Sequence, residues 1–127
     1  MKLNQQRYSE DQRTGGTAIR AYGLIFHVYM IVDGEGRFVG KTFVRWNREH
    51  DISIYGFDST LSVVVGDRRL TKSFRKHHTA VRAALMVRAD DYARRRQTSK
   101  DEETRNQWGA HEKDLHTRLV EKRGMDR

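Results

Sequence analysis

The chain has 127 residues, a formal net charge of +8, no cysteine and no proline. This length can bury one core without a disulfide or metal staple, and the lack of cysteine excludes disulfides, thiolate metal sites and cysteine nucleophiles. We find no apolar run that suits a signal peptide or a bilayer-spanning helix, so we expect a cytoplasmic protein with no membrane partner.

The N-terminal third begins with a polar stretch and continues with a segment in which apolar residues occupy alternate positions. Residues 1–17 are polar and lack periodicity, which predicts a flexible N-terminal arm. In the segment 18–32 all even positions from Tyr22 onward are apolar. This alternation predicts one long strand with a core face.

Shorter strand signals follow, separated by turn residues. Asp and Gly at 33–36 allow a reversal into a strand over 37–46, and weaker strand patterns cover 52–57, 60–65 and 70–75. Because every connection is short, we expect a four- or five-stranded antiparallel sheet arranged as a meander.

Two helices are predicted after the sheet. Residues 79–96 place an apolar stripe on one face, with Arg88 inside it, where a guanidinium must reach water, pair with an acid or belong to a binding surface. Ser99 and Glu102 have the spacing of a capping box and predict a second helix to about residue 122. Its Trp108 and Leu115 should pack on the sheet or on another chain.

These elements predict an α+β fold in three segments. They are a flexible arm (1–17), a sheet with a bracing helix (18–97) and a C-terminal helix (98–127).

Positive charge is concentrated between the last strands and the first helix. Residues 66–97 contain ten basic and three acidic side chains, so nearly all of the net charge lies there. In the strand 70–75 and its preceding turn, alternation places Arg69, Thr71, Ser73 and Arg75 on one face. A solvated face of a basic protein gives the same pattern, but a row of cations and hydroxyls can also hold phosphates. The candidate nucleic-acid-binding residues are Arg68, Arg69, Lys72, Arg75, Lys76, Arg82 and Arg88.

The segment 60–92, in which "VVVGDRRLTKSF" leads into "TAVRAALMVRADDY", resembles the ethylene-response-factor (apetala-type) DNA-binding module. In that family a three-stranded sheet enters the major groove and a helix braces it from behind. The resemblance implies that cations of the sheet approach DNA while apolar helix residues brace it. These are Arg68, Arg69, Lys72 and Arg75 in the sheet, and Val81, Leu85 and Tyr92 in the helix.

A second resemblance covers "VYMIVDGEGRFVGKT" at 28–42, which looks like the paired strands of GIY-YIG nucleases. It implies a metal-dependent nuclease with Tyr29, Phe38-Val39-Gly40 and Arg48 in the site. Only Asp90 or Asp91 could then supply the metal-binding carboxylate.

Histidine spacing predicts no metal site and we expect no cofactor. His77 and His78 are sequence neighbours, while His111 and His116 are five apart, a spacing that does not share a helix face.

We therefore expect a binding protein rather than an enzyme. The first hypothesis is a small nucleic-acid-binding protein, with DNA preferred over RNA, that contacts the phosphate backbone. The alternative is a non-enzymatic inhibitor or adaptor of the phage or mobile-element type, which uses the basic face on an acidic partner. The third is the GIY-YIG-like endonuclease.

Overall fold

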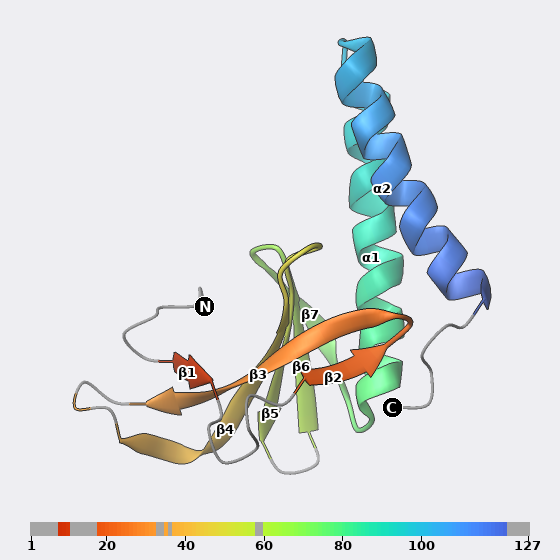
Figure 1. Ribbon diagram of the computed structural model, residues 1–127. Helices are drawn as coiled ribbons and strands as arrows, with labels where there is room; N and C mark the ends of the chain where they lie inside the picture. Colours follow the sequence, from red (N-terminus) through yellow and green to blue (C-terminus); the bar gives the residue numbers. More distant parts are fainter. Residues whose placement is uncertain (1–7, 11–17, 33–34, 36, 58–59, 122–127) are drawn as a thin grey trace.

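The computed structural model describes residues 8–10, 18–32, 35, 37–57 and 60–121. These residues form an antiparallel sheet followed by two helices, so the expected α+β class is confirmed (Figure 1). The elements are β1 (Tyr8–Glu10), β2 (Ala18–Ala21), β3 (Leu24–Val32), β4 (Phe38–Asn47), β5 (Ile52–Phe57), β6 (Thr60–Val65), β7 (Arg68–Phe74), α1 (His77–Thr98) and α2 (Glu102–Glu121).

The sheet is wider than expected. Its described strands follow the order β1-β3-β4-β5-β6-β7, and β2 also pairs with β3. Because β1 pairs with residues 29–31 and β2 with residues 24–27, the two short strands share one edge of β3. The meander from β3 to β7 is confirmed, but the described part of the sheet has seven strands rather than four or five.

The single strand expected over 18–32 is a hairpin. Tyr22 and Gly23 have φ values of 55° and 76°, and this pair reverses the chain between Ala21 and Leu24, which face each other in the register. A bulky residue at positive φ is strained. Here Tyr22 is only 1% exposed, so burial of its ring in the core offsets the strain.

The turn between the sixth and seventh strands is shorter than the four residues, 66–69, that the expected strands 60–65 and 70–75 leave between them. β7 begins at Arg68, and the turn consists of Gly66, at φ 63°, and Asp67. Both arginines at 68 and 69 therefore belong to the strand, where adjacent side chains point to opposite faces.

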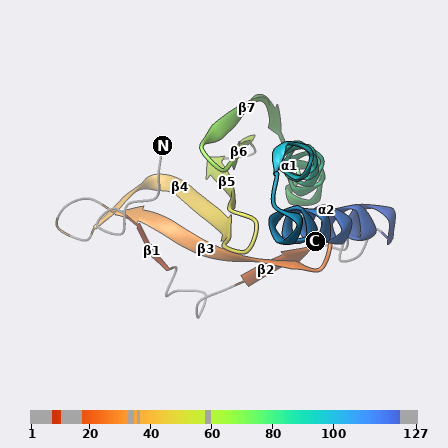
Figure 2. The same cartoon turned by 90° about the horizontal axis from the view of Figure 1, so that it is seen from above.

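One hydrophobic core lies between the sheet and α1. Seen from above, the sheet curves around α1, and its concave face points toward the helix (Figure 2). The helix packs on β2, β5, β6 and β7. The apolar stripe predicted for this helix is confirmed as buried; its members are Val81, Ala84, Leu85, Ala89 and Tyr92.

The second helix packs on α1 of the same chain. Leu115 is fully buried in the core, and Trp108 stacks on Tyr92 with ring centroids 5.7 Å apart. The cap differs from the expected one, because the Asp101 carboxylate accepts a hydrogen bond from the Thr104 amide while Ser99 closes the end of α1. Together the helices form a hairpin whose tip projects beyond the sheet (Figure 1). Neither helix is long and apolar enough to cross a membrane within the described residues.

Candidate functional site

Three arginines of the basic stretch converge on one carboxylate. Asp91 on α1 is 8% exposed. Its Oδ1 accepts hydrogen bonds from Arg68, at 2.6 Å, and from Arg94, and its Oδ2 accepts one from Arg88 at 3.2 Å. Hydrogen bonds between charged donors and a carboxylate are stronger than bonds between neutral groups. These three cations are therefore engaged within the fold.

Arg88 lies within the apolar stripe of α1, and its guanidinium is bound by groups inside the fold. Its Nε donates to the carbonyl oxygen of His50 at 2.9 Å, and its guanidinium carbon lies 5.4 Å from the ring centroid of Tyr92. The side chain is 14% exposed. Arg88, predicted to contact phosphate, instead joins α1 to the β4–β5 turn, because burial makes an internal partner obligatory.

The arginines at the end of α1 point in different directions. While Arg94 turns to Asp91, the guanidinium of Arg95 lies 4.8 Å from the ring centroid of Trp108, and Arg96 Nε donates to Glu112 Oε1 at 2.7 Å. Adjacent residues on a helix are separated by about 100°. This triplet therefore forms no common anion-binding surface.

Four of the predicted cations remain exposed along one edge of the sheet. Arg69 and Lys72 lie on β7, and Arg75 and Lys76 connect β7 to α1. Among the described residues, no carboxylate lies within ion-pair distance of any of them. We call these four residues the β7 cation row. β7 is the last strand in the sheet order, so the row follows a sheet edge.

Arg82 lies apart from this row. It is exposed on α1, and its charge counteracts the rise that burial causes in the pKa of Tyr22. Tyr22 is in the β2–β3 turn, whereas β7 is at the other end of the strand order. The structure thus places Arg82 on the β2 side of the helix.

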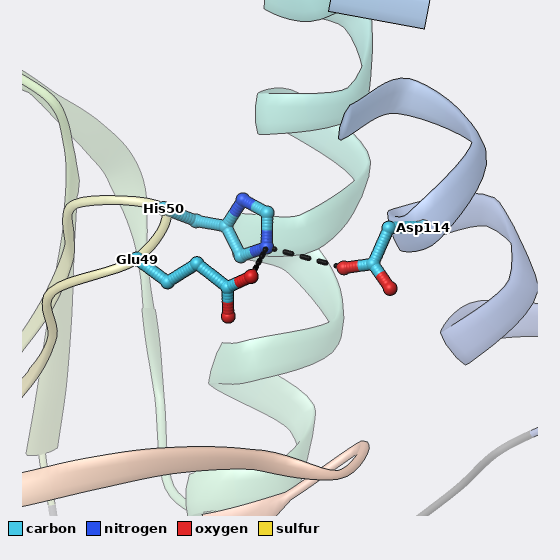
Figure 3. Close-up of side chains that lie close together, drawn as sticks. All are labelled: Glu49, His50 and Asp114. Carbon is cyan, nitrogen blue, oxygen red and sulfur yellow. Dashed lines mark hydrogen bonds and ion pairs between the residues drawn. The ribbon is translucent and has the colours of Figure 1, made fainter. Parts of the chain in front are cut away.

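A second polar cluster joins the β4–β5 turn to both helices (Figure 3). The His50 ring is fully buried, with Nδ1 2.7 Å from the Tyr92 hydroxyl and Nε2 3.3 Å from Asp114 Oδ2. Glu49 Oε2 lies 3.8 Å from the same Nε2. The His111 ring packs edge-on against His50, with centroids 6.0 Å apart.

The local sequence of the turn fixes the position of His50. Asn47 Oδ1 accepts a hydrogen bond from the His50 amide, and Asn47 Nδ2 donates to the Ile25 carbonyl on β3. Asp51 follows at φ 53°, a conformation that Asp tolerates better than most residues. The turn is therefore held rigidly, and the histidine ring enters the space between the helices.

The electrostatics of the cluster favour a neutral histidine. Burial lowers the pKa of His50, although Glu49 and Asp114 act in the opposite direction. For Asp114, burial raises the pKa, but hydrogen bonds and charges from Arg118 and His50 outweigh burial and lower it. The pair is thus best described as a neutral imidazole hydrogen-bonded to a carboxylate.

The same cluster offers three candidate metal ligands. Single atoms of Glu49, His50 and Asp114 lie within 4.8 Å of one another, and such donors suit a divalent cation. However, Asp114 Oδ2 also accepts a hydrogen bond from Arg118 Nε at 3.0 Å. A metal on that oxygen would compete with a guanidinium and be repelled by it, so the donors fit a hydrogen-bonded clasp better than a metal site.

The residues that the nuclease resemblance implies are not gathered at one place. Tyr29 lies on the face of the sheet that points away from α1, whereas Asp91 lies on α1 and binds three guanidiniums. Arg48 and Asp90 are exposed. The side chains of 38–40 lie outside the described residues, and the nuclease hypothesis stays a prediction.

Sequence reasoning did not identify His50 or its contact with Tyr92. The two residues are 42 positions apart, and only the packing of α1 on the sheet brings them together. Local histidine spacing contains no signal for such a contact.

No family model, curated protein or solved structure matches this chain.

Proposed function

We propose that this protein binds nucleic acid and that the β7 cation row contacts the phosphate backbone. The proposal is supported by the fact that some cations of the basic stretch are bound within the fold and others are not. The fold engages Arg68, Arg88 and Arg94 with one carboxylate, whereas the four cations of the row face solvent without a described acidic partner. A cation without an internal partner keeps its full charge for an external anion.

The length of the row suits a polymeric anion. β7 has seven residues, and at about 3.3 Å per residue it extends roughly 23 Å. One strand of B-form DNA carries a phosphate about every 3.4 Å along the axis, so several phosphates can lie along this sheet edge, where Arg69 and Lys72 project from opposite faces of β7. Thr71 and Ser73 are exposed on the same strand and can add hydrogen bonds to phosphate oxygens.

Charge-neutralising variants test the row directly. We expect Arg75→Gln and Lys76→Gln each to weaken binding of a labelled oligonucleotide and to reduce the salt dependence of log Kd by about one unit of slope. Lys100→Gln is the matched control, since it removes the same charge from an exposed residue between the two helices, at the tip of the hairpin. If all three variants lose affinity equally, the row has no special role and the proposal fails.

An acidic protein surface is the other partner that such a row could bind. A pull-down from lysate with and without nuclease treatment separates the two possibilities. Loss of captured material after nuclease treatment supports nucleic acid. Retention of one protein in both samples supports the inhibitor or adaptor hypothesis instead.

A further inference from the structure

The convex face of the sheet, which points away from α1, carries three aromatic residues on adjacent strands. Tyr29 on β3 and Tyr55 on β5 both pair with Val44 of β4, so these three side chains form one row across the sheet. Trp46 of β4 lies in the next row, opposite His27. The rings of Tyr29 and Trp46 are 6.4 Å apart between centroids.

These aromatic side chains are partly exposed and held in place. Val44, between the two tyrosines, is fully buried, while both tyrosines and Trp46 keep part of their surface in solvent. Trp46 Nε1 donates a hydrogen bond to Asp51 Oδ1 at 3.1 Å, which fixes the indole. In the described part of the chain, both helices lie on the other side of the sheet (Figure 2).

One member of the β7 cation row, Arg69, lies on this face beside the aromatic residues, whereas Lys72 lies on the opposite face of β7, 5.5 Å from the ring centroid of Phe74. The register pairs Trp46 with Ser53, Ser53 with Val64, and Val64 with Arg69. Arg69 therefore lies in the same row across the sheet as Trp46. The guanidinium of Arg69 is 6.0 Å from the ring centroid of Tyr55. Ser62 and Ser73 continue the row of Tyr55 toward the same edge. The face thus runs from aromatic rings to hydroxyls and a cation.

This combination indicates the chemistry of the ligand. Aromatic rings and arginine also occur at protein–protein interfaces, but a second copy of this chain would bring another net charge of +8 to a face that already carries a guanidinium. Bases offer flat faces that stack on such rings, and phosphates pair with the cation. In a duplex those base faces are already stacked on one another, so only an unpaired strand can use the aromatic residues.

We propose that the protein binds single-stranded nucleic acid, with bases stacked on Tyr29, Trp46 and Tyr55 and the backbone held by the β7 cation row. This inference rests on the proposed function and specifies its substrate. Stacking is tolerant of base identity, because every base has a π-face. The protein should therefore bind single strands of different sequence with similar affinity.

Two measurements on the full chain test the stacking contacts. In a Trp108→Phe background Trp46 is the remaining tryptophan, and we expect its fluorescence to be quenched by a 15-nucleotide oligothymidine but not by the matched duplex. We also expect Tyr55→Leu to weaken oligothymidine binding about tenfold, since one base loses its stacking partner, and to leave the salt slope unchanged. Tyr55→Phe retains the ring and should bind like the wild type, which separates stacking from a folding defect.

The outcomes distinguish this inference from the proposed function. If duplex and single strand bind equally, with a steep salt dependence and no effect of Tyr55→Leu, the stacking inference is overturned and backbone binding stands. If the single strand quenches Trp46 and Tyr55→Leu weakens binding, but affinity does not respond to salt, the aromatic contacts stand and the cation row is overturned.

Discussion

The guanidinium of Arg68 lies 2.6 Å from the carboxylate of Asp91 and joins the first residue of β7 to the middle of α1. The next residue, Arg69, points to the opposite face of the sheet, beside Tyr55. Two arginines adjacent in sequence therefore have different environments, because side chains alternate along a strand. Arg68 is half exposed and paired with a carboxylate, whereas Arg69 is exposed and lies beside an aromatic ring.

Removal of the Asp91 carboxylate should destabilise the protein. We expect Asp91→Asn to lower the free energy of unfolding by about 3 kcal/mol, mainly because the mostly buried Arg88 loses its charged partner. Arg68 and Arg94 are half exposed and should contribute little. Chemical denaturation measures the effect. Asp90→Asn, the exposed neighbour, is the control and should change stability by less than about 0.5 kcal/mol. Equal effects of the two variants would show that Asp91 does not organise the arginines.

Loss of the His50–Tyr92 hydrogen bond should also lower the free energy of unfolding. We expect Tyr92→Phe to cost about 1–2 kcal/mol, because the buried Nδ1 of His50 then lacks its partner. Tyr29→Phe removes a hydroxyl from a partly exposed tyrosine and should be nearly neutral in thermal or urea unfolding. A neutral Tyr92→Phe would mean that the clasp at the β4–β5 turn is not held by this bond.

His77 should make the protein less stable in mild acid. Burial, followed by the positive charges of Arg45 and His78, lowers the pKa of His77 to about 3 from its usual 6.5. The unfolded chain therefore takes up a proton first as pH falls. Stability should be complete above about pH 6.5 and should fall by about 1.4 kcal/mol per pH unit toward pH 3 from this group.

Replacement of His77 by phenylalanine keeps an aromatic ring but removes the titrating nitrogens, so it isolates the effect of His77 protonation. The His77 ring packs edge-on against Phe26, and neither of its nitrogens has a hydrogen-bond partner in the described structure. His77→Phe should therefore show a shallower loss of stability between pH 6 and pH 4 than the wild type, whereas His27→Phe, at an exposed position, should not. Identical pH profiles for wild type and His77→Phe would contradict the assignment.

Divalent metal should not stabilise the cluster at His50. Because the Arg118 guanidinium already binds the Asp114 carboxylate and would repel a cation, we expect Zn²⁺ or Mn²⁺ to leave Tm unchanged for the wild type. Glu49→Gln is the matched variant, and it should respond to metal in the same way. A rise in Tm with metal that Glu49→Gln abolishes would identify a metal site.

Periodicity predicted the helices and the central meander because these elements alternate or repeat over many residues. It failed at Tyr22-Gly23, where the apolar alternation continues through a turn, so the pattern showed no break. The only local signal was one glycine. The capping of α2 was also misassigned, since both Ser99 and Asp101 precede the helix with suitable side chains and only the backbone geometry distinguishes them.

The candidate site was less predictable than the fold. Charge density located the basic stretch, but it could not show that Arg68 and Arg88 would meet Asp91, a contact between separate elements. The aromatic face was equally hidden, because Tyr29, Trp46 and Tyr55 lie on three strands and share a surface only through the sheet register. Tertiary pairing decides both features.

The salt dependence of oligonucleotide binding tests the central claim most directly. With about four phosphates neutralised by the β7 cation row, log Kd plotted against log[NaCl] should have a slope magnitude of about 3 for a single strand. The titration uses the wild-type chain and a labelled oligothymidine between 50 and 300 mM NaCl, roughly the range in which counterion release dominates. A slope near 3 is the predicted result. A flat plot, or no binding at the lowest salt, would contradict it.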